Sequence, residues 1–523
     1  MIEFELDGRP VAVPDDGTSL LDALRDRLGR RSVKDGCSPQ GQCGCCTIWV
    51  DGRPRVACVT PVGRVRGRRV TTIDGIPDAA AWAERFCATG ASQCGFCTPG
   101  IVMRLAALDQ TDRADPDAVR RALLAHLCRC TGWQPIVDAC TSVDDPPTRS
   151  PIARKAAERR AHLEGGRPQT VDRDVALGRA GFADDSAPPD ALVAVLDAEG
   201  GWVVGESLAH ARREAGTVQG RRSTAPVRWP IEMPDVPGDA ARTLQTTWVE
   251  PAYLEPDASW CEPGGEPASP LGNGGAFGGK ERSPVAATAR RLADRYDRPV
   301  RAVLSREDTV RLGPKRPPVA GWVRADEVGL LTVAAPQTPH DRSILRGSIA
   351  AVAPDVEVQF VPAVGPLSAS TVRAAGWAEA AVLVASCRPP EAPVVAPNGA
   401  AATATIRDEG GREVVSVWVS CGRSLDDTVL RSYCVGAAHM ALGWVRSESL
   451  AVDDGGVPVD LTIRSFGVLR AVDTPQVEVT IAPDDGPPIN GSDAVFAAVA
   501  AAAWRATGFA PRWPVGDRVA AGG

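Results

Sequence analysis

The cysteines of this chain are concentrated near one end, and no other feature constrains the fold and chemistry as strongly. Of the 15 cysteines in 523 residues, eleven lie before residue 141 and four in the remainder. A disulfide-stabilised secreted domain is usually a short chain that follows a signal peptide. This chain is long and begins MIEFELDG, with acidic residues where a signal peptide has basic ones. We therefore expect a cytoplasmic protein whose clustered thiols bind metal.

The clustered cysteines fall into two sets of four. The first set is Cys37, Cys43, Cys46 and Cys58, and the second is Cys94, Cys97, Cys128 and Cys130. Four thiolates are what a [2Fe–2S] cluster requires, two for each iron. A four-cysteine zinc site would fit the same spacings. The CGFC pair alone would also suit a thioredoxin-like redox site, although no βαβ pattern surrounds it.

Three further cysteines, Cys45, Cys87 and Cys140, lie in the same region. Cys45 could replace Cys46 as a ligand, but the two-residue spacing after Cys43 favours Cys46. Cys87 and Cys140 fit the role of small buried side chains. The glycines between the ligands would let the loop direct backbone N–H groups at the cluster sulfurs, which helps to set a reduction potential.

The hydrophobic pattern predicts a multidomain α+β protein. Residues 2–6 and 11–13 alternate around Asp7-Gly8, which predicts a β-hairpin, and Thr18 or Ser19 can cap the helix that follows. Residues 1–75 therefore fit a ferredoxin-like β-grasp domain. Residues 76–145 have helical periodicity, with Asp115 as an N-cap, and fit a domain like a four-helix bundle. The charged, proline-flanked segment 146–170 is expected to be a linker, and mixed strands and helices follow it.

The charge and hydropathy of the chain exclude two kinds of partner. A formal net charge of −7 is contrary to the basic surface that a nucleic-acid-binding protein needs. The longest purely apolar stretch runs from Ala494 to Trp504 and is too short to cross a bilayer. We therefore expect neither nucleic acid nor a membrane as a partner.

The cysteine segments resemble a known family. GCSPQGQCGCCT, VACVTP, SQCGFCTPGIVM and LCRCTGW are similar to the iron–sulfur subunit of the molybdenum hydroxylases, the family of xanthine oxidase, aldehyde oxidoreductase and carbon monoxide dehydrogenase. The resemblance implies that the first set of thiols holds an outer, plant-type [2Fe–2S] cluster and the second an inner one close to a molybdopterin. It also implies that Gln93 and Cys130 lie within hydrogen-bonding reach of the pterin. Two departures are a gap of five rather than four residues after Cys37, and Trp133 where tyrosine is common.

The remainder of the chain resembles the molybdopterin-binding subunit of the same family. The matching segments are 172–199, 249–258, 272–281, 304–318 and 370–380. The resemblance implies three reduced domains: a hammerhead-like domain over 171–245 and molybdopterin-binding-like domains over 246–390 and 391–523.

Within these segments the resemblance points to four cofactor-binding residues: Gly275, Phe277, Gly278 and Arg373. Glycines let a backbone approach a cofactor closely. The alternatives are a flexible turn for the glycine-rich segment and a surface position for Arg373. A nucleotide-binding P-loop is rejected, because Glu281 stands where Ser or Thr would bind Mg²⁺.

The catalytic carboxylate of the family is missing. Molybdenum hydroxylases use a glutamate in a GxGE motif as the base, and this chain has no GxGE near its C-terminus. By the same resemblance, the glutamine-bearing segments that hold the pterin are deleted, because only thirteen residues separate 254–258 from the glycine-rich loop. We therefore expect an iron–sulfur subunit that relays electrons from a partner's molybdopterin centre to a flavin (FAD) subunit. The alternatives are a self-contained hydroxylase with Asp493 or Glu281 as base, and a zinc-stabilised interaction protein.

Overall fold

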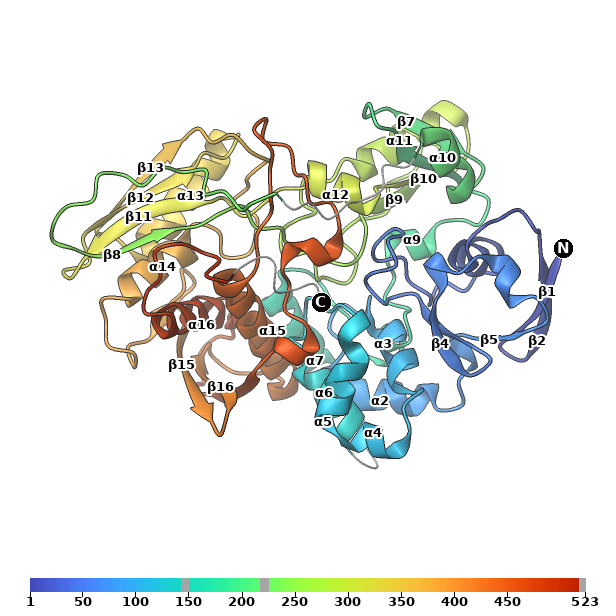
Figure 1. Cartoon of the computed structure of the whole chain (residues 1–523), viewed down its shortest axis with the longest axis horizontal. Coiled ribbons are helices and arrows are strands. Elements are labelled where there is room, and N and C mark those ends of the chain that lie inside the picture. The colour runs from blue at the N-terminus through green and yellow to red at the C-terminus, as the bar shows by residue number, and fades with distance from the viewer. Residues whose placement is uncertain (143–149, 217–224, 517–523) are drawn as a thin grey trace.

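The computed structural model describes residues 1–142, 150–216 and 225–516. The N-terminal residues form a five-stranded sheet (Figure 1). Its strand order is β2-β1-β5-β3-β4. The strands are β1 (Ile2–Leu6), β2 (Arg9–Val13), β3 (Thr47–Val50), β4 (Arg53–Val56) and β5 (Arg69–Thr71). β1 and β2 form the predicted hairpin, and its turn residues Asp7 and Gly8 both have positive φ, as a two-residue hairpin turn requires.

One short helical segment packs against this sheet. It begins as α1 (Leu20–Asp22) and continues as a π-helical turn over Ala23–Arg27. The hydroxyl of Ser19 accepts a hydrogen bond from the backbone N–H of Asp22 at 3.1 Å, which is the predicted N-cap. The apolar faces of the helix and the sheet enclose a small core that also contains Cys46 and Cys58.

Residues 76–142 form a group of short helices beside the first sheet (Figure 1). They are α2 (Ala79–Thr89), α3 (Thr98–Leu105), α4 (Gln110–Ala114), α5 (Pro116–Ala122) and α6 (Gln134–Thr141). Asp115 caps α5 as predicted, since its carboxylate accepts from the N–H of Asp117 at 2.9 Å. A chain reversal after α5 brings Cys128 and Cys130 back toward α3.

The segment expected to be a linker contains a packed helix. Residues 143–149 lie outside the described residues, and α7 (Pro151–Gly165) follows them. Ser150 caps α7, and Ala157, Arg160 and Ala161 are buried on the face that packs against α15. The connection between the helices and the rest of the chain is therefore a structural element of the C-terminal part.

Three four-stranded sheets make up that part. The first has the order β7-β6-β10-β9 and combines β6 (Leu192–Leu196), β7 (Trp202–Gly205), β9 (Ala258–Cys261) and β10 (Val300–Val303). The second has the order β13-β12-β11-β8 and combines β8 (Ala240–Gln245), β11 (Val319–Arg324), β12 (Gly329–Ala334) and β13 (Val356–Val361). In each of these two sheets, strands that precede residue 246 pair with strands that follow it. The domain boundary expected at residue 245 therefore does not separate two independent sheets.

The third sheet has the order β14-β15-β16-β17. Its strands are β14 (Val394–Val395), β15 (Ala401–Glu409), β16 (Arg412–Ser420) and β17 (Gln476–Ile481). The helices of the C-terminal part are α8 (Arg173–Ala176), α9 (Ala183–Ser186), α10 (Leu208–Ala215), α11 (Val285–Tyr296), α12 (Arg306–Leu312), α13 (Pro339–Val352), α14 (Trp377–Ala385), α15 (Asp427–Arg446) and α16 (Ser492–Ala506). α15 is almost entirely buried, and it passes between α16 and the helices of the N-terminal part (Figure 1).

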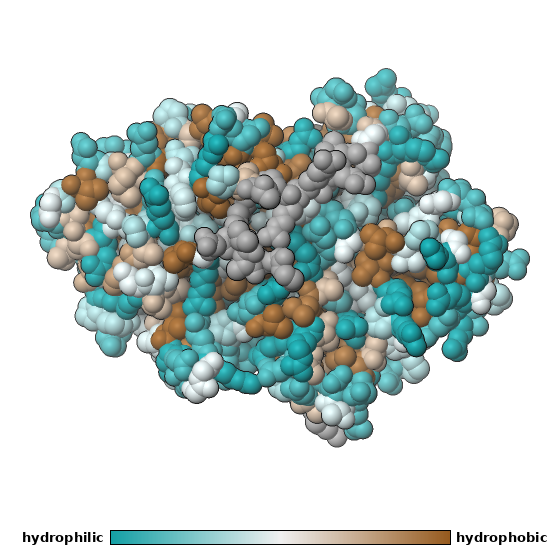
Figure 2. Space-filling model, in the orientation of Figure 1, coloured by the Kyte–Doolittle hydropathy of each residue, from teal (hydrophilic) through white to brown (hydrophobic). Residues whose placement is uncertain are grey.

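The surface is mostly polar on the face seen in Figure 2, where hydrophobic residues form separate small patches. Exposed apolar side chains such as Val59, which is 60% exposed, are scattered along the chain. Across residues 1–142, 150–216 and 225–516, no helix combines the length and apolar composition that crossing a membrane would require.

Candidate metal centres and the adjoining cleft

The structure brings together Cys37, Cys43, Cys46 and Cys58, here called the outer set. All four side chains are buried, in the loop before β3 and just after β4. The thiol of Cys37 hydrogen-bonds with those of Cys43 and Cys58, and these contacts hold the pKa of Cys37 well below its usual value. Cys58 also contacts Cys46, and its pKa is raised mainly through its contact with Cys37.

Backbone N–H groups point at the outer sulfurs, as expected for a cluster-binding loop. The N–H groups of Gln40 and Gln42 approach the Cys37 sulfur at 3.2 and 3.5 Å. That of Cys58 approaches the Cys46 sulfur at 3.4 Å. The five-residue gap places Ser38 at a φ of 48°, so the additional residue is accommodated by a turn with positive φ.

Cys45 is placed differently from the outer set. Its N–H lies 3.5 Å from the Cys43 sulfur, and its thiol contacts that of Cys43. The Cys58 thiol contacts Cys46 instead. Electrostatic interactions link Cys45 to Cys128 of the second set. This geometry supports Cys46 as the ligand and puts Cys45 between the two sets.

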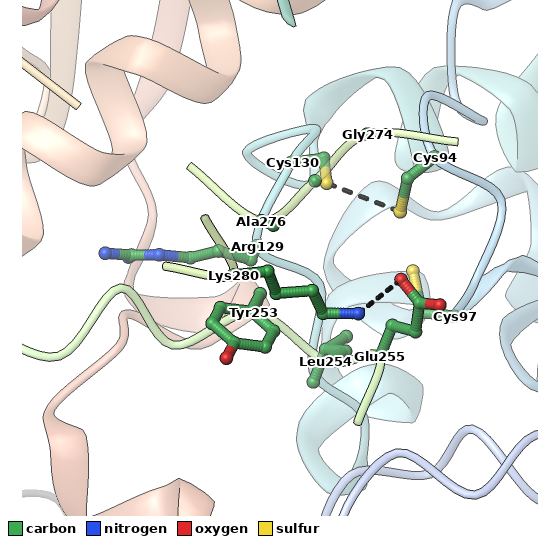
Figure 3. A pocket seen from close by; sticks show the side chains of 11 residues that line it. Cys94, Cys97, Arg129, Cys130, Tyr253, Leu254, Glu255, Gly274, Ala276 and Lys280 are labelled. Atoms are coloured by element: carbon green, nitrogen blue, oxygen red, sulfur yellow. Dashed lines mark hydrogen bonds and ion pairs between the residues drawn. The ribbon is translucent and has the colours of Figure 1, made fainter. Parts of the chain in front are cut away.

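The second group of thiols, here called the inner set, is Cys94, Cys97, Cys128 and Cys130. The sulfurs of Cys94 and Cys130 are 3.6 Å apart, as Figure 3 shows. The thiol of Cys97, at the N-cap of α3, hydrogen-bonds with that of Cys128 and lowers the pKa of Cys128 to about 7. The hydroxyl of Thr131 contributes a contact with the Cys128 sulfur at 3.1 Å.

The arrangement has the donors of two four-sulfur clusters. All fifteen cysteines lie in the described residues, and each is a free thiol. The inner sulfurs approach one another in two pairs, and the outer sulfurs form a continuous row of contacts from Cys43 through Cys37 and Cys58 to Cys46. Four thiols gathered in this way could share a two-iron cluster. In the part of the chain that the structure describes, no group of three or more His, Cys, Asp or Glu side chains is arranged to hold a single metal ion.

A backbone hydrogen bond connects the segments that carry the two sets. The N–H of Leu127, which precedes Cys128, donates to the carbonyl of Cys43 at 3.0 Å. Close packing supports this contact: a Cβ on Gly44 would lie 2.5 Å from the ring of His126. A Cβ on Gly100, in α3, would lie 2.4 Å from the carbonyl of Gly44. Glycine is therefore required at both positions.

A cleft adjoins the inner set and extends over about 950 Å³, part of it open to solvent. Five of the residues expected to bind the cofactor line it: Gln93, Gly275, Phe277, Gly278 and Arg373. The sixth, Cys130, lines a smaller adjoining cavity together with Gly275 (Figure 3). The fold thus brings together residues that lie up to 280 positions apart in the sequence.

The glycine-rich segment is held rigidly against the inner set. Gly275 has a φ of 81°, and a Cβ on it would lie 3.0 Å from the Cys94 sulfur and 3.2 Å from that of Cys130. A Cβ on Gly278 would lie 1.7 Å from the carbonyl of Thr371. These contacts are contrary to the flexible-turn interpretation, because each glycine allows a specific close approach.

Arg373 lies largely covered in the cleft and is not a surface arginine. Its side chain is 9% exposed, and its Nε donates to the Asp493 carboxylate at 2.7 Å. Its Nη2 donates to the hydroxyl of Ser492 at 2.7 Å, and its guanidinium carbon lies 5.9 Å from the centre of the Phe277 ring. Glu281, the other candidate base, forms an ion pair with Arg167 at the cleft edge at 2.5 Å.

Other residues of the cleft were not predicted from the sequence. Glu164 of α7 is buried, pairs with Arg160 at 2.9 Å, and accepts the N–H groups of Gly491 and Ser492. The i, i+4 spacing of Arg160 and Glu164 could have indicated that they form an ion pair. It could not indicate that the pair is buried, because such spacing in a charged segment is typical of an exposed helix. Tyr433 donates to the amide oxygen of Gln169 at 2.5 Å.

The smaller cavity also contains a buried ion pair that the sequence did not indicate. Lys280 and Glu255 are 2.6 Å apart, and Figure 3 shows both side chains alongside Cys97 and Tyr253. Burial raises the pKa of Glu255 to about 7, although the charge of Lys280 acts in the opposite direction.

Comparisons with known proteins agree with this geometry in the N-terminal part. Residues 4–63 match the family described as "2Fe-2S iron-sulfur cluster binding domain", and residues 72–141 match the "[2Fe-2S] binding domain" family. The iron–sulfur-binding subunit of xanthine dehydrogenase from Escherichia coli O157:H7 is 38% identical over 146 residues, which is 26% of this chain and 89% of that protein.

The same region matches only a part of longer relatives. Aldehyde oxidoreductase of Megalodesulfovibrio gigas is 43% identical over 132 residues, 23% of this chain but 14% of that protein. At the level of fold, a solved structure of aldehyde oxidoreductase from Desulfovibrio gigas matches with a TM-score of 0.72 at 14% identity, covering 99% of both chains. The enzyme from Desulfovibrio desulfuricans ATCC 27774 matches with a TM-score of 0.68 at 15% identity, covering 96% of this chain and 97% of that one.

Proposed function

The chain belongs to the molybdenum hydroxylase family, and on that premise we propose that it is an iron–sulfur electron-transfer subunit of a molybdenum-dependent hydroxylase or dehydrogenase. It would take electrons from a molybdopterin centre held by a partner chain and pass them through two [2Fe–2S] clusters. A flavin subunit or another acceptor would receive them. The fifteen free thiols are consistent with a reducing compartment, and we propose the cytoplasm.

The observation that carries this proposal is the pair of linked four-thiol sets. Each set offers only sulfur donors, most of them buried and approached by backbone N–H groups. Bound there, each [2Fe–2S] cluster would supply a site that accepts and releases one electron at a time. The hydrogen bond from Leu127 to Cys43 gives the two sets a short connection through the protein.

The chain's own residues also support an order for the relay. Gly275 places the wall of the cleft against the sulfurs of Cys94 and Cys130, so the inner set faces the cleft. The outer set lies across the Leu127–Cys43 contact, on the side of the first sheet. We propose that electrons enter at the cleft and leave from the outer set.

The described lining of the cleft offers a molybdopterin no unpaired cationic side chain. Each cationic side chain among its described lining residues is already paired: Arg373 with Asp493, and Arg167 with Glu281. Gln93 uses its amide nitrogen for the carbonyl of Cys130 and the hydroxyl of Ser432. A pterin phosphate would therefore meet no unpaired cation among the described residues that line this cleft.

We propose accordingly that the partner holds the pterin and that this chain only contacts it. The contacts would come from Gln93, Cys130, Gly275, Phe277, Gly278 and Arg373. We retain the domain assignments 1–75 and 76–145 for cluster binding, and we propose that 171–245, 246–390 and 391–523 are reduced counterparts of the molybdenum subunit, with 171–245 and 246–390 joined by shared sheets rather than separate. These last three would act mainly as a scaffold for docking.

Metal analysis of the isolated chain tests the proposal directly. We expect about four iron atoms per polypeptide, two for each cluster, with no stoichiometric molybdenum or zinc. EPR of the reduced protein should show two distinct iron–sulfur signals. Stoichiometric molybdenum and pterin in the chain purified alone would refute the relay role, and zinc in place of iron would refute both clusters.

One observation favours a second candidate, a self-contained hydroxylase. Asp493 and Glu281 both line the cleft, so a carboxylate is available there despite the missing GxGE motif. Each is engaged by an arginine, which is the arrangement of a structural pair rather than of a free base. The candidate predicts bleaching of the cluster absorbance when aldehydes or azaheterocycles are added to the isolated chain, and loss of bleaching in Asp493→Asn.

A further inference from the structure

Arg306 reaches from the C-terminal part of the chain to the loop that carries the outer set. It is the first residue of α12 and is fully buried. Its Nη2 donates to the carbonyl oxygens of Gly36 and Leu254, both at 2.8 Å. Gly36 immediately precedes Cys37, and Leu254 lines the cavity beside the inner set. The guanidinium group therefore connects the surroundings of the two thiol sets.

The charge of Arg306 is not balanced by a carboxylate. Its Nε and Nη1 are buried without a hydrogen-bond partner. It forms no ion pair with any residue in the described ranges. A buried, unpaired guanidinium is costly unless an anion lies nearby. A [2Fe–2S] cluster with four thiolate ligands is such an anion, and each added electron makes it more negative.

Arg464 approaches the same loop at a second point. It lies in the short 3-10 helix Ile463–Phe466, and its Nε donates to the carbonyl of Gln42 at 2.9 Å. Gln42 immediately precedes Cys43. Arg464 is half-buried and, within the part of the chain that is described, has no carboxylate partner. Burial lowers the pKa of Arg464, whereas the thiols of Cys43 and Cys37 raise it.

Other buried arginines of the chain differ from these two. Arg129 is paired with Glu448 at 2.5 Å, and Arg316 with Glu379 at 2.7 Å. Each of these pairs is close to neutral as a unit. Arg306 and Arg464 instead donate to carbonyl groups that directly precede an outer-set cysteine, and neither is paired with a carboxylate in the described ranges.

We propose that Arg306 and Arg464 are positioning residues that hold two positive charges against the outer cluster and thereby raise its reduction potential. The C-terminal part would then act on electron transfer itself, by making the outer cluster the more favourable place for the electron. One electron enters the cluster and no bond is formed or broken. The cluster's negative charge increases by one, and the two fixed cations stabilise that increase.

The proposal is tested on the isolated, full-length, cluster-loaded chain by redox titration with EPR detection. We expect Arg306→Gln to lower the ratio of reduced to oxidised outer cluster about tenfold at a fixed potential. This is the size expected for a unit charge roughly 10 Å away at an effective dielectric constant of about 20. A tenfold change corresponds to about 59 mV for one electron. Arg464→Gln should produce a smaller shift in the same direction, because its side chain is closer to solvent.

Two controls and two rescue variants separate charge from structure. Arg311→Gln, on α12, and Arg470→Gln, six residues beyond Arg464, each remove one positive charge from a partly exposed side chain. Because solvent screens such charges, each should shift the potential much less than Arg306→Gln does. Arg306→Lys and Arg464→Lys retain the charge and should restore most of the wild-type potential.

Three results would overturn the proposal. One is an unchanged potential in both glutamine variants at full iron content. Another is a lysine variant that shifts the potential as far as its glutamine counterpart, which would indicate a role in loop geometry alone. If Arg306→Gln loses iron, Arg464→Gln decides, and an unchanged potential there refutes the proposal. The inference rests on the proposed function only in requiring that the clusters are present. Molybdenum found in the isolated chain would refute the relay role, but it would not change the expected differences in the reduction potential of the outer cluster.

Discussion

Residues 1–142 and residues 150–516 use their reactive side chains in opposite ways. In the N-terminal part, seven of the eight thiols of the outer and inner sets are buried, and none of the eight forms a disulfide, so they remain available to a metal. In the cleft of the C-terminal part, the charged side chains are paired with each other, as Arg373 with Asp493. The first arrangement leaves donors free for a cofactor, and the second leaves the charged groups engaged with one another. The comparison teaches that a fold can match a solved structure along its whole length while the charged side chains of its cleft are paired among themselves.

The largest effect is expected when one thiol is removed from the N-terminal part, and this tests the contrast between the two parts most severely. We expect Cys97→Ser to abolish the inner cluster and reduce iron from about four to about two atoms per chain, because a two-iron cluster loses one of its four thiolates. Iron analysis and the loss of one of two EPR signals would measure this. Cys434→Ser, at an equally buried thiol of the C-terminal part, is the matched control and should retain full iron. Equal iron loss in both variants would contradict the assignment.

The next largest effect concerns the contact between the two parts. Arg129, between Cys128 and Cys130, is clamped by both oxygens of Glu448 at 2.5 and 2.7 Å, and both side chains are buried. We expect Glu448→Ala to lower the free energy of unfolding by about 3–5 kcal/mol, because it leaves a buried charge without its partner. Denaturant unfolding of the loaded protein would measure the change.

The control for that prediction is a partly exposed ion pair at the C-terminal end of α15, two residues before Glu448. Glu413 pairs with Arg446 at 2.8 Å, with both side chains partly exposed. Glu413→Ala should cost about 0–1 kcal/mol. If the two substitutions cost the same, the Arg129–Glu448 contact would not be a principal link between the parts.

A smaller effect should appear as a pH dependence. His439 of α15 is buried beside the inner-set loop, and burial lowers its pKa from 6.5 to about 4. The unfolded chain therefore binds a proton between these values that the folded chain does not, so stability is complete above pH 6.5 and falls as the pH falls toward 4. At pH 5 the loss is about 2 kcal/mol. His439→Gln should remove this part of the slope, whereas His210→Gln, at a largely exposed histidine, should leave it in place.

Local sequence was sufficient for the N-terminal part. The two cysteine sets could be delimited by spacing, and their assignment as cluster ligands, implied by the family resemblance, stays a prediction. Ser19 and Asp115 cap their helices as predicted, because capping depends on residues a few positions apart. The grouping of Gln93 with the glycine-rich segment was implied by the family resemblance, and the structure places both at one cleft.

The C-terminal part could not be predicted in the same way, because its contacts join distant residues. The pairing of Arg373 with Asp493 spans 120 positions, and β6 pairs with β10 across more than a hundred. The charged segment expected to be a linker forms a packed helix. Arg160 on this helix donates to the carboxylate of Glu164, four residues on, and to the carbonyls of Arg423 and Ser424, which are distant in the sequence. Periodicity alone cannot reveal such partners.

The smallest predicted effect tests whether the cleft carboxylates are structural. Glu281 and Arg167 form a pair in which both side chains are about a third exposed, so Glu281→Gln should change the free energy of unfolding by about 0.2–1 kcal/mol, and less at high salt. Glu164→Gln, in the same cleft, removes a fully buried charge that binds Arg160 and two backbone N–H groups, and it should cost several times more. Thermal unfolding of both variants at two salt concentrations measures the difference. The contrary outcome is that Glu281→Gln leaves the free energy of unfolding unchanged and abolishes the substrate-dependent bleaching of the cluster absorbance. That result would show that this carboxylate takes part in catalysis, and the contrast between the two parts of the chain would not hold for the cleft.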